Sequence, residues 1–200
     1  MKINSATFLI SAPDLGACPE SDLPEFAFIG RSNVGKSSMI NLLTGRSHLA
    51  KVSKTPGFTK LINFFTINRA WSLVDLPGYG YAKVAERHRT EFSQAVAGYL
   101  KHRPNLRCSF VLIDSRLTPQ RIDLEFLTWL ATAGIPFVLV FTKTDKLKPN
   151  ALKANMAAFL ESLSAACGVA PQTFTSSSVE RTGRAEILEF IDESLAGMTT

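Results

Sequence analysis

The chain has 200 residues and a formal net charge of +5 at pH 7, and 46% of its residues are hydrophobic while 20% are charged. This composition is typical of one globular domain and excludes disordered and fibrous proteins. The longest apolar stretch, residues 135–141, is far shorter than the about 20 residues of a membrane span, so we expect no stable membrane association. Cys18, Cys108 and Cys167 show neither metal-binding spacing nor even pairing, which predicts reduced thiols in a cytoplasmic protein.

The first 23 residues predict an N-terminal extension. The stretch ATFLISAPDLGAC, residues 6–18, has a superficial likeness to a secretion signal followed by a lipid-attachment box. Its apolar run is short, contains Thr7 and Ser11, and is interrupted by Pro13 and Asp14. We therefore expect an opening strand and a turn rather than a targeting segment.

From residue 26 onward, short apolar runs alternate with longer segments of helical period. The expected strands are residues 26–29, 61–67, 71–75, 108–114, 137–142 and 172–176, and the expected helices are residues 36–43, 87–102, 119–133, 150–167 and 183–196. A short NRA turn joins two of the strands into an antiparallel hairpin, whereas the alternation elsewhere predicts parallel strands. We predict a single α/β domain over residues 1–200, with its core at about 24–196. Its sheet is expected to be mostly parallel and six-stranded, with one antiparallel edge strand and helices on both faces.

The segment GRSNVGKS, residues 30–37, matches the pattern G-x-x-x-x-G-K-[ST] between an expected strand and an expected helix. Gly30 and Gly35 allow the backbone to curl close to a phosphate, and unpaired N–H groups at the helix start favour an anion. Lys36 adds a positive charge for the β- and γ-phosphates, and the Ser37 hydroxyl can bind Mg²⁺. The segment predicts a cradle for nucleotide phosphates.

A second motif, DLPG at residues 75–78, closes the strand that follows the hairpin turn. The Asp75 carboxylate can support the Mg²⁺ shell, and the Gly78 N–H can detect the γ-phosphate. Between the two motifs, residues 44–60 carry Pro56 and Gly57 and few apolar anchors, which predicts a loop. A threonine of this loop is expected to complete the Mg²⁺ shell when the γ-phosphate is bound, and the residues alone leave Thr55 and Thr59 as alternatives.

The base is indicated by TKTD at residues 142–145, which ends the most apolar strand. The Asp145 carboxylate can accept the N1–H and 2-amino hydrogens of guanine, whereas adenine offers neither donor and would leave the charge unpaired. The stem of Lys143 can pack along the base, and a backbone N–H of Ser176-Ser-Ser178 can reach the guanine carbonyl oxygen. The three motifs together predict GTP.

The motifs GRSNVGKSS, KTPGFT, NFF, DLPGYGYAK and TKTD resemble those of the bacterial EngB (YihA/YsxC) GTPases, in the Era-like branch of translation-associated GTPases. The resemblance covers about residues 6–195, and DLPGYGYAK is its most specific element. It implies a Ras-like P-loop GTPase fold, GTP with Mg²⁺, and a role in assembly of the large ribosomal subunit that is required for normal cell division and septation. Phe58 departs from the basic or polar residue often found at that position of the family.

Carried over by motif, the resemblance implies that Thr59 rather than Thr55 joins Ser37 as a Mg²⁺ ligand. No catalytic base is assigned, but Lys36 and Gly78, with Thr59, are expected to support hydrolysis. The GTP contacts expected from the motifs are Gly30, Arg31, Ser32, Asn33, Val34, Gly35, Lys36, Ser37, Gly57, Phe58, Thr59, Lys60, Leu61, Asp75, Leu76, Pro77, Gly78, Thr142, Lys143, Thr144, Asp145, Ser176, Ser177 and Ser178.

Tyr79 stands where many GTPases carry a glutamine that orients the attacking water. A phenol has no amide, and its hydroxyl lies further from the backbone, so we expect slow hydrolysis and a role as a molecular switch. Asn33 stands where potassium-dependent relatives of the Era-like branch place a cation-binding asparagine. Hydrolysis that depends on K⁺ and an asparagine that only shapes the loop are alternatives at this point.

The charge is distributed unevenly, because residues 31–107 contain thirteen Lys and Arg but three Asp and Glu. This excess predicts a basic face for a polyanionic partner, and we expect a monomer that binds rRNA and protein of large ribosomal particles. Two alternatives are a GTPase acting directly on division machinery and a P-loop kinase for a small molecule. No basic amphipathic helix supports the first, and the TKTD motif has no use in the second.

Overall fold

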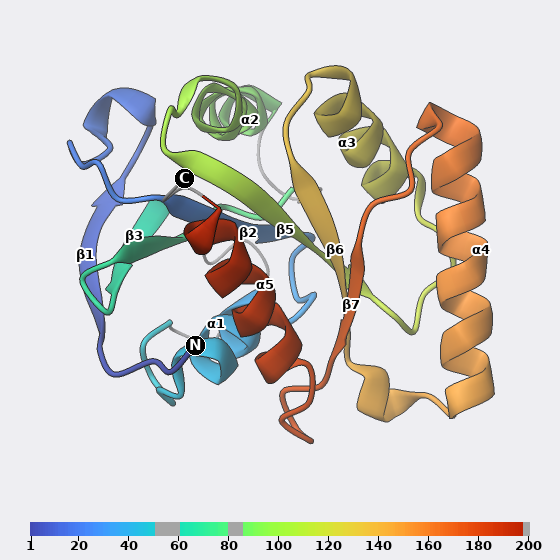
Figure 1. Cartoon of the computed structure of the whole chain (residues 1–200). Helices are drawn as coiled ribbons and strands as arrows, with labels where there is room; N and C mark the ends of the chain where they lie inside the picture. The colour runs from blue at the N-terminus through green and yellow to red at the C-terminus, as the bar shows by residue number, and fades with distance from the viewer. Residues whose placement is uncertain (51–60, 80–85, 198–200) are drawn as a thin grey trace.

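The computed structural model describes residues 1–50, 61–79 and 86–197. Within this part of the chain, seven strands form one sheet in the order β1-β3-β4-β2-β5-β6-β7 (Figure 1). The strands are β1 (Ala6–Ala12), β2 (Glu25–Gly30), β3 (Ile62–Ile67), β4 (Trp71–Asp75), β5 (Leu106–Asp114), β6 (Phe137–Thr142) and β7 (Thr173–Ser176). The α/β class and the mostly parallel sheet are thereby confirmed.

The sheet differs from the prediction in its number of strands. β1, from the expected extension, joins the sheet as a seventh strand, so the antiparallel strand β3 lies one position inside the edge. β3 runs antiparallel to both β1 and β4, whereas β4, β2, β5, β6 and β7 are mutually parallel. The pairing of β1 escaped prediction because its partner lies some fifty residues later in the chain, with no short turn to announce it.

The edge strand β1 contains a β-bulge. Phe8 pairs with Phe65 and Ile10 pairs with Phe64, so that Leu9 is an extra residue in the ladder. Phe8, Leu9 and Ile10 are 40–51% exposed.

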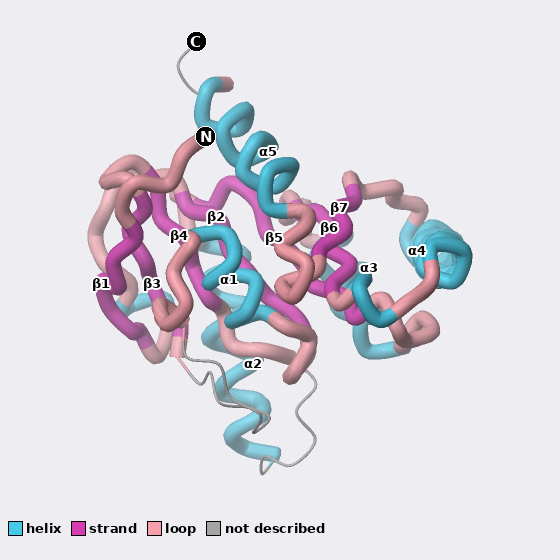
Figure 2. Tube along the Cα trace, turned by 90° about the horizontal axis from the view of Figure 1, so that it is seen from below, coloured by secondary structure: helices cyan, strands magenta, loops and turns pink. Residues whose placement is uncertain are grey.

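Helices cover both faces of the sheet (Figures 1 and 2). They are α1 (Lys36–Thr44), α2 (Glu86–His102), α3 (Arg121–Thr132), α4 (Pro149–Cys167) and α5 (Arg184–Ala196), with short 3₁₀ turns η1 (Leu15–Ala17) and η2 (Thr144–Lys146). Residues of α1 and α5 share one hydrophobic cluster with the sheet, and residues of α2, α3 and α4 share the other. None of the helices in the described ranges is long and apolar enough to cross a membrane.

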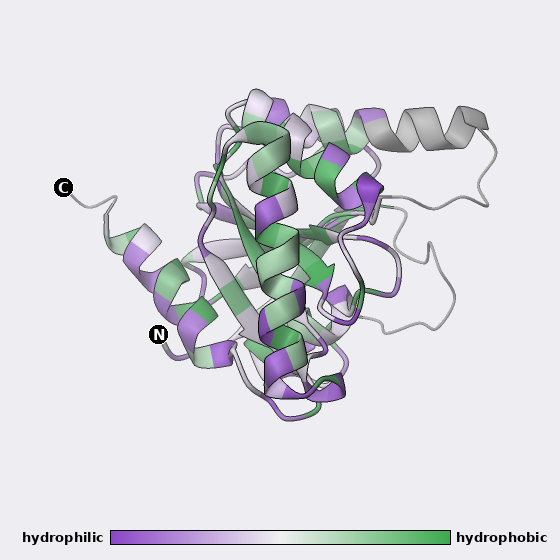
Figure 3. Ribbon diagram, turned by 90° about the vertical axis from the view of Figure 1, so that its right-hand side faces the viewer, coloured by the Kyte–Doolittle hydropathy of each residue, from purple (hydrophilic) through white to green (hydrophobic). Residues whose placement is uncertain are grey.

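Predicted and observed element bounds agree within two residues. The largest difference at a helix start is at α3, which begins at Arg121 rather than at residue 119. Gln120 has an extended backbone with φ −98° and ψ 131°, so it precedes α3 as the N-cap residue, whose backbone angles are not helical. The helices carry both hydrophobic and hydrophilic residues (Figure 3), as helices with one face on a sheet do.

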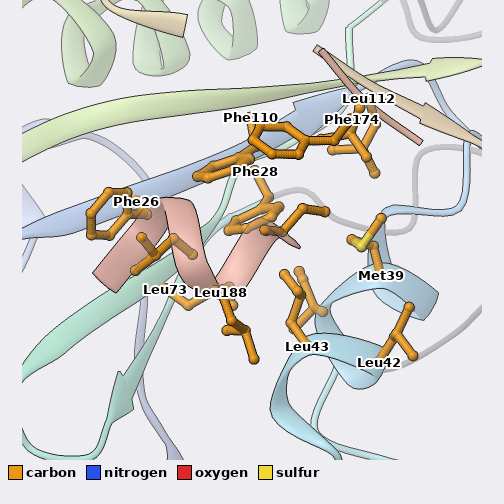
Figure 4. Packing of buried hydrophobic residues seen from close by; sticks show 14 of the residues in the cluster. Phe26, Phe28, Met39, Leu42, Leu43, Leu73, Phe110, Leu112, Phe174 and Leu188 are labelled. Carbon is orange, nitrogen blue, oxygen red and sulfur yellow. The ribbon is translucent and has the colours of Figure 1, made fainter. Parts of the chain in front are cut away.

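The cluster beneath α1 fixes the helix that follows the phosphate motif. Phe28 and Phe110 stack with ring centroids 4.7 Å apart, and Met39 and Leu43 of α1 pack over this layer with 1% exposure or less (Figure 4). Each such side chain contributes roughly 1.5–3 kcal/mol through burial. The start of α1 is therefore held rigidly at the carboxyl end of β2.

Candidate functional site

The predicted motifs meet at one edge of the sheet because the strands that carry them are parallel. β2, β4, β6 and β7 all end at this edge, where residues 30–37, 75–78, 142–145 and 176–178 follow them. Ligands of such sheets bind outside the carboxyl ends of the strands. The topology therefore brings together four segments that lie far apart in the sequence.

The phosphate motif forms a tight loop between β2 and α1. Asn33 and Gly35 have positive φ angles of 65° and 108°, which turn the backbone back on itself. A Cβ on Gly30 would lie 2.8 Å from the Leu112 carbonyl oxygen, so only glycine fits there. The N–H of Met39 donates to the Gly35 carbonyl at 2.9 Å as the first bond of α1, and the N–H groups of the preceding helical residues are therefore left for an anion.

Lys36 and Asp75 form a buried ion pair between this loop and the end of β4. Both side chains are less than 10% exposed. A charge buried this deeply needs a partner of opposite sign, so the two motifs are linked electrostatically. Ser37, the predicted metal ligand, is half-buried in the first turn of α1, directly after Lys36.

The DLPG segment lies directly against the phosphate loop. The N–H of Leu76 donates to the Phe28 carbonyl at 3.0 Å, and Tyr79 forms a parallel bridge with Arg31. A Cβ on Gly78 would lie 2.8 Å from the Gly30 carbonyl oxygen. The close approach explains the glycine at position 78.

The TKTD segment packs on the other side of the phosphate loop. The Thr142 hydroxyl donates to the Val34 carbonyl at 2.7 Å, and Lys143 Nζ donates to the Asn33 carbonyl at 2.7 Å. Lys143 adopts a left-handed backbone with φ 61°, which directs the chain into the 3₁₀ turn η2. Thr142 and Lys143 thus connect the base motif to the phosphate cradle, and Thr144 begins η2.

Asp114, at the end of β5, holds Lys143 in place. Its Oδ2 lies 2.8 Å from Lys143 Nζ and 2.8 Å from Arg116 Nη2. Burial raises the pKa of Asp114, but the hydrogen bonds from Arg116 and Lys143 outweigh it and lower the value to about 2. Sequence reasoning missed Asp114, although a carboxylate that ends a continuous apolar strand beside the base motif was a usable signal.

Asp145 is oriented by the segment after β7. The Ser177 hydroxyl donates to Asp145 Oδ1 at 2.7 Å, and Lys146 Nζ lies 3.0 Å from Oδ2. The hydrogen bond from Ser177, followed by that from Lys146, lowers the pKa of Asp145, which keeps the carboxylate ionised. Ser176 and Ser177 are buried while Ser178 is exposed, so the three serines have different surroundings.

A sharp turn follows these serines. Gly183 has φ 81°, and a Cβ there would lie 2.1 Å from the Thr175 carbonyl oxygen. The Ser176 hydroxyl donates to the Thr182 carbonyl at 3.0 Å. Ser176 therefore stabilises the turn between β7 and α5, whose short separation agrees with the predicted bounds.

Four predicted contacts, Gly57, Phe58, Thr59 and Lys60, lie outside the described residues, as do Thr55 and Lys83. Leu61 is 40% exposed immediately before β3. The remaining predicted contacts line the edge described above, where the structure brings them together.

Tyr79 makes contacts that its position after Gly78 did not suggest. Its hydroxyl donates to Asp123 Oδ1 of α3 at 2.9 Å, and its ring stacks on Phe126 at 4.3 Å. Oδ2 of Asp123 also forms an ion pair with Arg31 Nε, at 3.1 Å. Sequence reasoning missed Asp123, which shares the buried stripe of α3 with Leu127 and Leu130; a carboxylate on an apolar stripe was the available signal.

The chain is similar to several known proteins. A family profile described as "50S ribosome-binding GTPase" matches residues 25–143. A probable GTP-binding protein EngB of Bacteroides thetaiotaomicron is 53% identical over 96% of this chain and 95% of its own length. The proteins of the same name from Bacteroides fragilis and Porphyromonas gingivalis are 52% and 50% identical, each over 96% of both chains.

Solved structures show the same fold. A crystal structure of a probable GTP-binding protein engB has a TM-score of 0.69 at 21% identity, covering 86% of this chain and 99% of that one. Aquifex aeolicus Era bound to GDP.AlF4- has a TM-score of 0.66 at 18% identity, covering 84% of this chain and 56% of that one. Taken with the profile match and the near full-length relatives, the three motifs at the sheet edge show that the chain belongs to the EngB proteins of the 50S ribosome-binding GTPase family and is a GTPase.

Proposed function

We propose that this GTPase is a slow molecular switch that acts in the cytoplasm in assembly of the large ribosomal subunit. The observation that carries the proposal is the concentration of positive charge in residues 31–107, which contain both segments expected to sense the γ-phosphate. A ligand that orders such segments changes which surface is presented to a partner. The description of the matched family as ribosome-binding also supports the proposed role in ribosome assembly.

GTP recognition is proposed to divide among the described motifs. Backbone N–H groups of residues 30–37 and the Lys36 ammonium hold the phosphates, and the Gly78 N–H detects the γ-phosphate. Asp145 selects guanine through its N1–H and 2-amino group, and Lys143 packs along the base. Among the proposed contacts, Gly57, Phe58, Thr59, Lys60 and Leu61 act as the first switch segment.

The donor set fits Mg²⁺, because Ser37 and Thr59 offer hydroxyl oxygens and Asp75 offers a carboxylate for its shell, all hard ligands. When bound, the ion would neutralise charge on the β- and γ-phosphates. In the structure, Lys36 and Asp75 pair with each other. When nucleotide and Mg²⁺ are bound, the phosphate oxygens would give Lys36 a negative partner, and the ion would give Asp75 a positive one. The residues themselves bind and orient the nucleotide.

Hydrolysis is proposed to be slow because Tyr79 cannot supply the amide of a water-orienting glutamine. Its hydroxyl is also directed to Asp123 of α3. A slow switch stays in its GTP state for a long time. In this proposal, the requirement for normal septation is a consequence of the role in ribosome assembly.

Co-sedimentation with large-subunit particles tests the proposal. We expect more binding with a non-hydrolysable GTP analogue than with GDP, and a fall in log affinity of roughly 0.7–0.9 per log unit of salt for each phosphate contact. Reversal of Lys83, Arg87 and Arg89 to Glu is expected to remove most of the binding and to spare nucleotide affinity.

A matched control reverses Lys2, Arg121 and Lys153, which lie outside residues 31–107 and are exposed. The control changes the net charge by the same amount, so it separates a local basic surface from total charge. Equal pelleting of the two triple variants and the parent protein would place the RNA-facing surface elsewhere and contradict the proposal.

A further inference from the structure

Asp123 of α3 joins the two segments that meet the γ-phosphate. Its Oδ1 accepts the Tyr79 hydroxyl at 2.9 Å, and its Oδ2 lies 3.1 Å from Arg31 Nε. Arg31 is the second residue of the phosphate loop, and Tyr79 directly follows Gly78. One carboxylate on a third element therefore holds both motifs, with a separate oxygen for each.

The burial of this group makes its two contacts interdependent. Asp123 is 2% exposed, and a charge so buried is costly unless it is paired and hydrogen-bonded. Burial raises the pKa of Asp123, and the Arg31 guanidinium opposes that rise. Removing either partner would leave a carboxylate oxygen unsatisfied inside the protein. The three side chains consequently favour one arrangement.

The Tyr79 ring fixes the same segment by packing. It stacks on Phe126 at 4.3 Å, and Phe126 stacks in turn on Trp129 at 5.8 Å. Both aromatic partners are on α3, one and two turns after Asp123. The hydroxyl and the ring of Tyr79 are thus attached to the same helix, which restricts the rotation of its backbone.

Gly78 lies between this attachment and the phosphate loop. A Cβ on Gly78 would lie 2.8 Å from the Gly30 carbonyl oxygen and 3.4 Å from Ser32 N, so its backbone is in close contact with the loop. Arg31 and Tyr79 form a parallel backbone bridge across the same contact. A shift of Tyr79 away from α3 would move the Gly78 N–H relative to the loop.

We infer that Asp123 is a positioning residue for γ-phosphate recognition, which holds Arg31 and Tyr79 so that the Gly78 N–H stays beside the cradle. The inference rests on the proposed role of Gly78. In the described part of the chain, Asp123 contacts Arg31 and Tyr79 rather than the base motif, so its effect should be specific to the nucleotide that carries a γ-phosphate. The inference predicts that a variant that breaks the contacts of Asp123 has a lower ratio of GTP affinity to GDP affinity.

The test is a pair of titrations, with GDP and with a non-hydrolysable GTP analogue in Mg²⁺, on Tyr79→Phe and Asp123→Asn. We expect the ratio of GTP-analogue affinity to GDP affinity to fall roughly 5-fold or more, while GDP affinity stays near that of the parent. Tyr79→Phe keeps the ring stack and removes one hydroxyl, so it carries the test if Asp123→Asn fails to fold.

The matched control is Tyr99→Phe. Tyr99 donates its hydroxyl to the buried Glu25 at 2.7 Å, at the opposite end of the sheet, so the variant loses the same kind of bond with no link to the phosphate motifs. We expect its affinity ratio to equal that of the parent. A fall of the same size in Tyr99→Phe would reveal a general loss of stability and overturn the inference.

Gly78→Ala separates the inference from the proposal on which it rests. If this variant loses GTP preference and both Tyr79→Phe and Asp123→Asn keep it, Gly78 contacts the γ-phosphate without help from Asp123, and the inference is wrong. If Gly78→Ala keeps the preference, the proposed γ-phosphate contact fails and the inference fails with it. Loss of preference in all three variants, with GDP affinity retained, supports both.

Discussion

The two ends of the sheet contain the same three chemical groups in different arrangements. At the amino end, the buried Glu25 accepts the Tyr99 hydroxyl at 2.7 Å and the Arg103 guanidinium at 2.6 and 3.0 Å. At the carboxyl end, the buried Asp123 accepts a tyrosine and an arginine through separate oxygens. Each end thus has a buried carboxylate that is paired with a guanidinium and a phenol.

The difference lies in where the partners come from. Tyr99 and Arg103 are four residues apart in and just after α2, and Arg103 also donates to the Pro19 carbonyl at 2.7 Å. Glu25 therefore anchors one helix and the N-terminal segment to β2. Asp123 instead draws its partners from two nucleotide motifs. The comparison indicates that the same chemistry serves stability at one end and ligand recognition at the other, according to the segments that it joins.

The largest effect is expected at the amino end. Arg103→Ala leaves Glu25, which is 0% exposed, without its cation and is expected to lower the free energy of unfolding by about 3–5 kcal/mol. Denaturant unfolding measures this loss, and Arg107→Ala at a nearby exposed position is the control. The ratio of GTP-analogue to GDP affinity should stay unchanged, and a change in that ratio would break the comparison.

The next effect is expected at the base motif. Asp145→Asn removes the acceptor for the 2-amino group and N1–H of guanine, so guanine nucleotides should bind more weakly by about 1.5–3 kcal/mol. Xanthine nucleotides, which exchange the amino group for an oxygen, should bind more tightly than they do to the parent protein. Titration of the variant with guanine and xanthine nucleotides checks the prediction, and unchanged GDP affinity would contradict the assignment of Asp145.

Acid should reveal a smaller contribution from Asp114. Its pKa of about 2 in the folded protein lies below the ordinary value of about 3.9. The group therefore stabilises the fold above pH about 4, and this contribution disappears as the pH falls toward 2. We expect Asp114→Asn to be less stable than the parent at pH 7 and the difference to shrink in acid. A difference that is constant with pH would show that the charge of Asp114 is not its cause.

The smallest effect is expected from the monovalent cation. Asn33 is exposed at the rim of the phosphate loop, and Tyr79 brings no charge to the reaction. We expect GTP turnover to be faster in K⁺ than in Na⁺ at matched ionic strength, and Asn33→Ala to remove the difference. Equal rates in the two buffers for the parent protein would leave Asn33 with a role in loop shape alone.

Local patterns predicted most of the fold and the motifs of the site. The strands over residues 110–113 and 137–141 are continuous apolar runs, and the phosphate loop has a fixed glycine spacing, so each is recognisable within its own segment. The pairing of β1 with β3 and the contact of Asp123 with Tyr79 join residues far apart in the chain, and a pattern within one segment does not show which distant residue is its partner. For the same reason, the sequence did not predict that Ser177 orients Asp145, although both residues are predicted GTP contacts.

The bulge at Leu9 has a consequence for association between molecules. An edge strand offers a row of backbone donors and acceptors to any other strand, and apolar side chains strengthen such pairing. Because β1 is synthesised about fifty residues before β3, Phe8 and Ile10 have no strand partner until the chain has grown that far. In the folded protein, the extra residue interrupts the even spacing of the ladder and bends the strand. The irregularity therefore makes that edge a poorer template for an incoming strand.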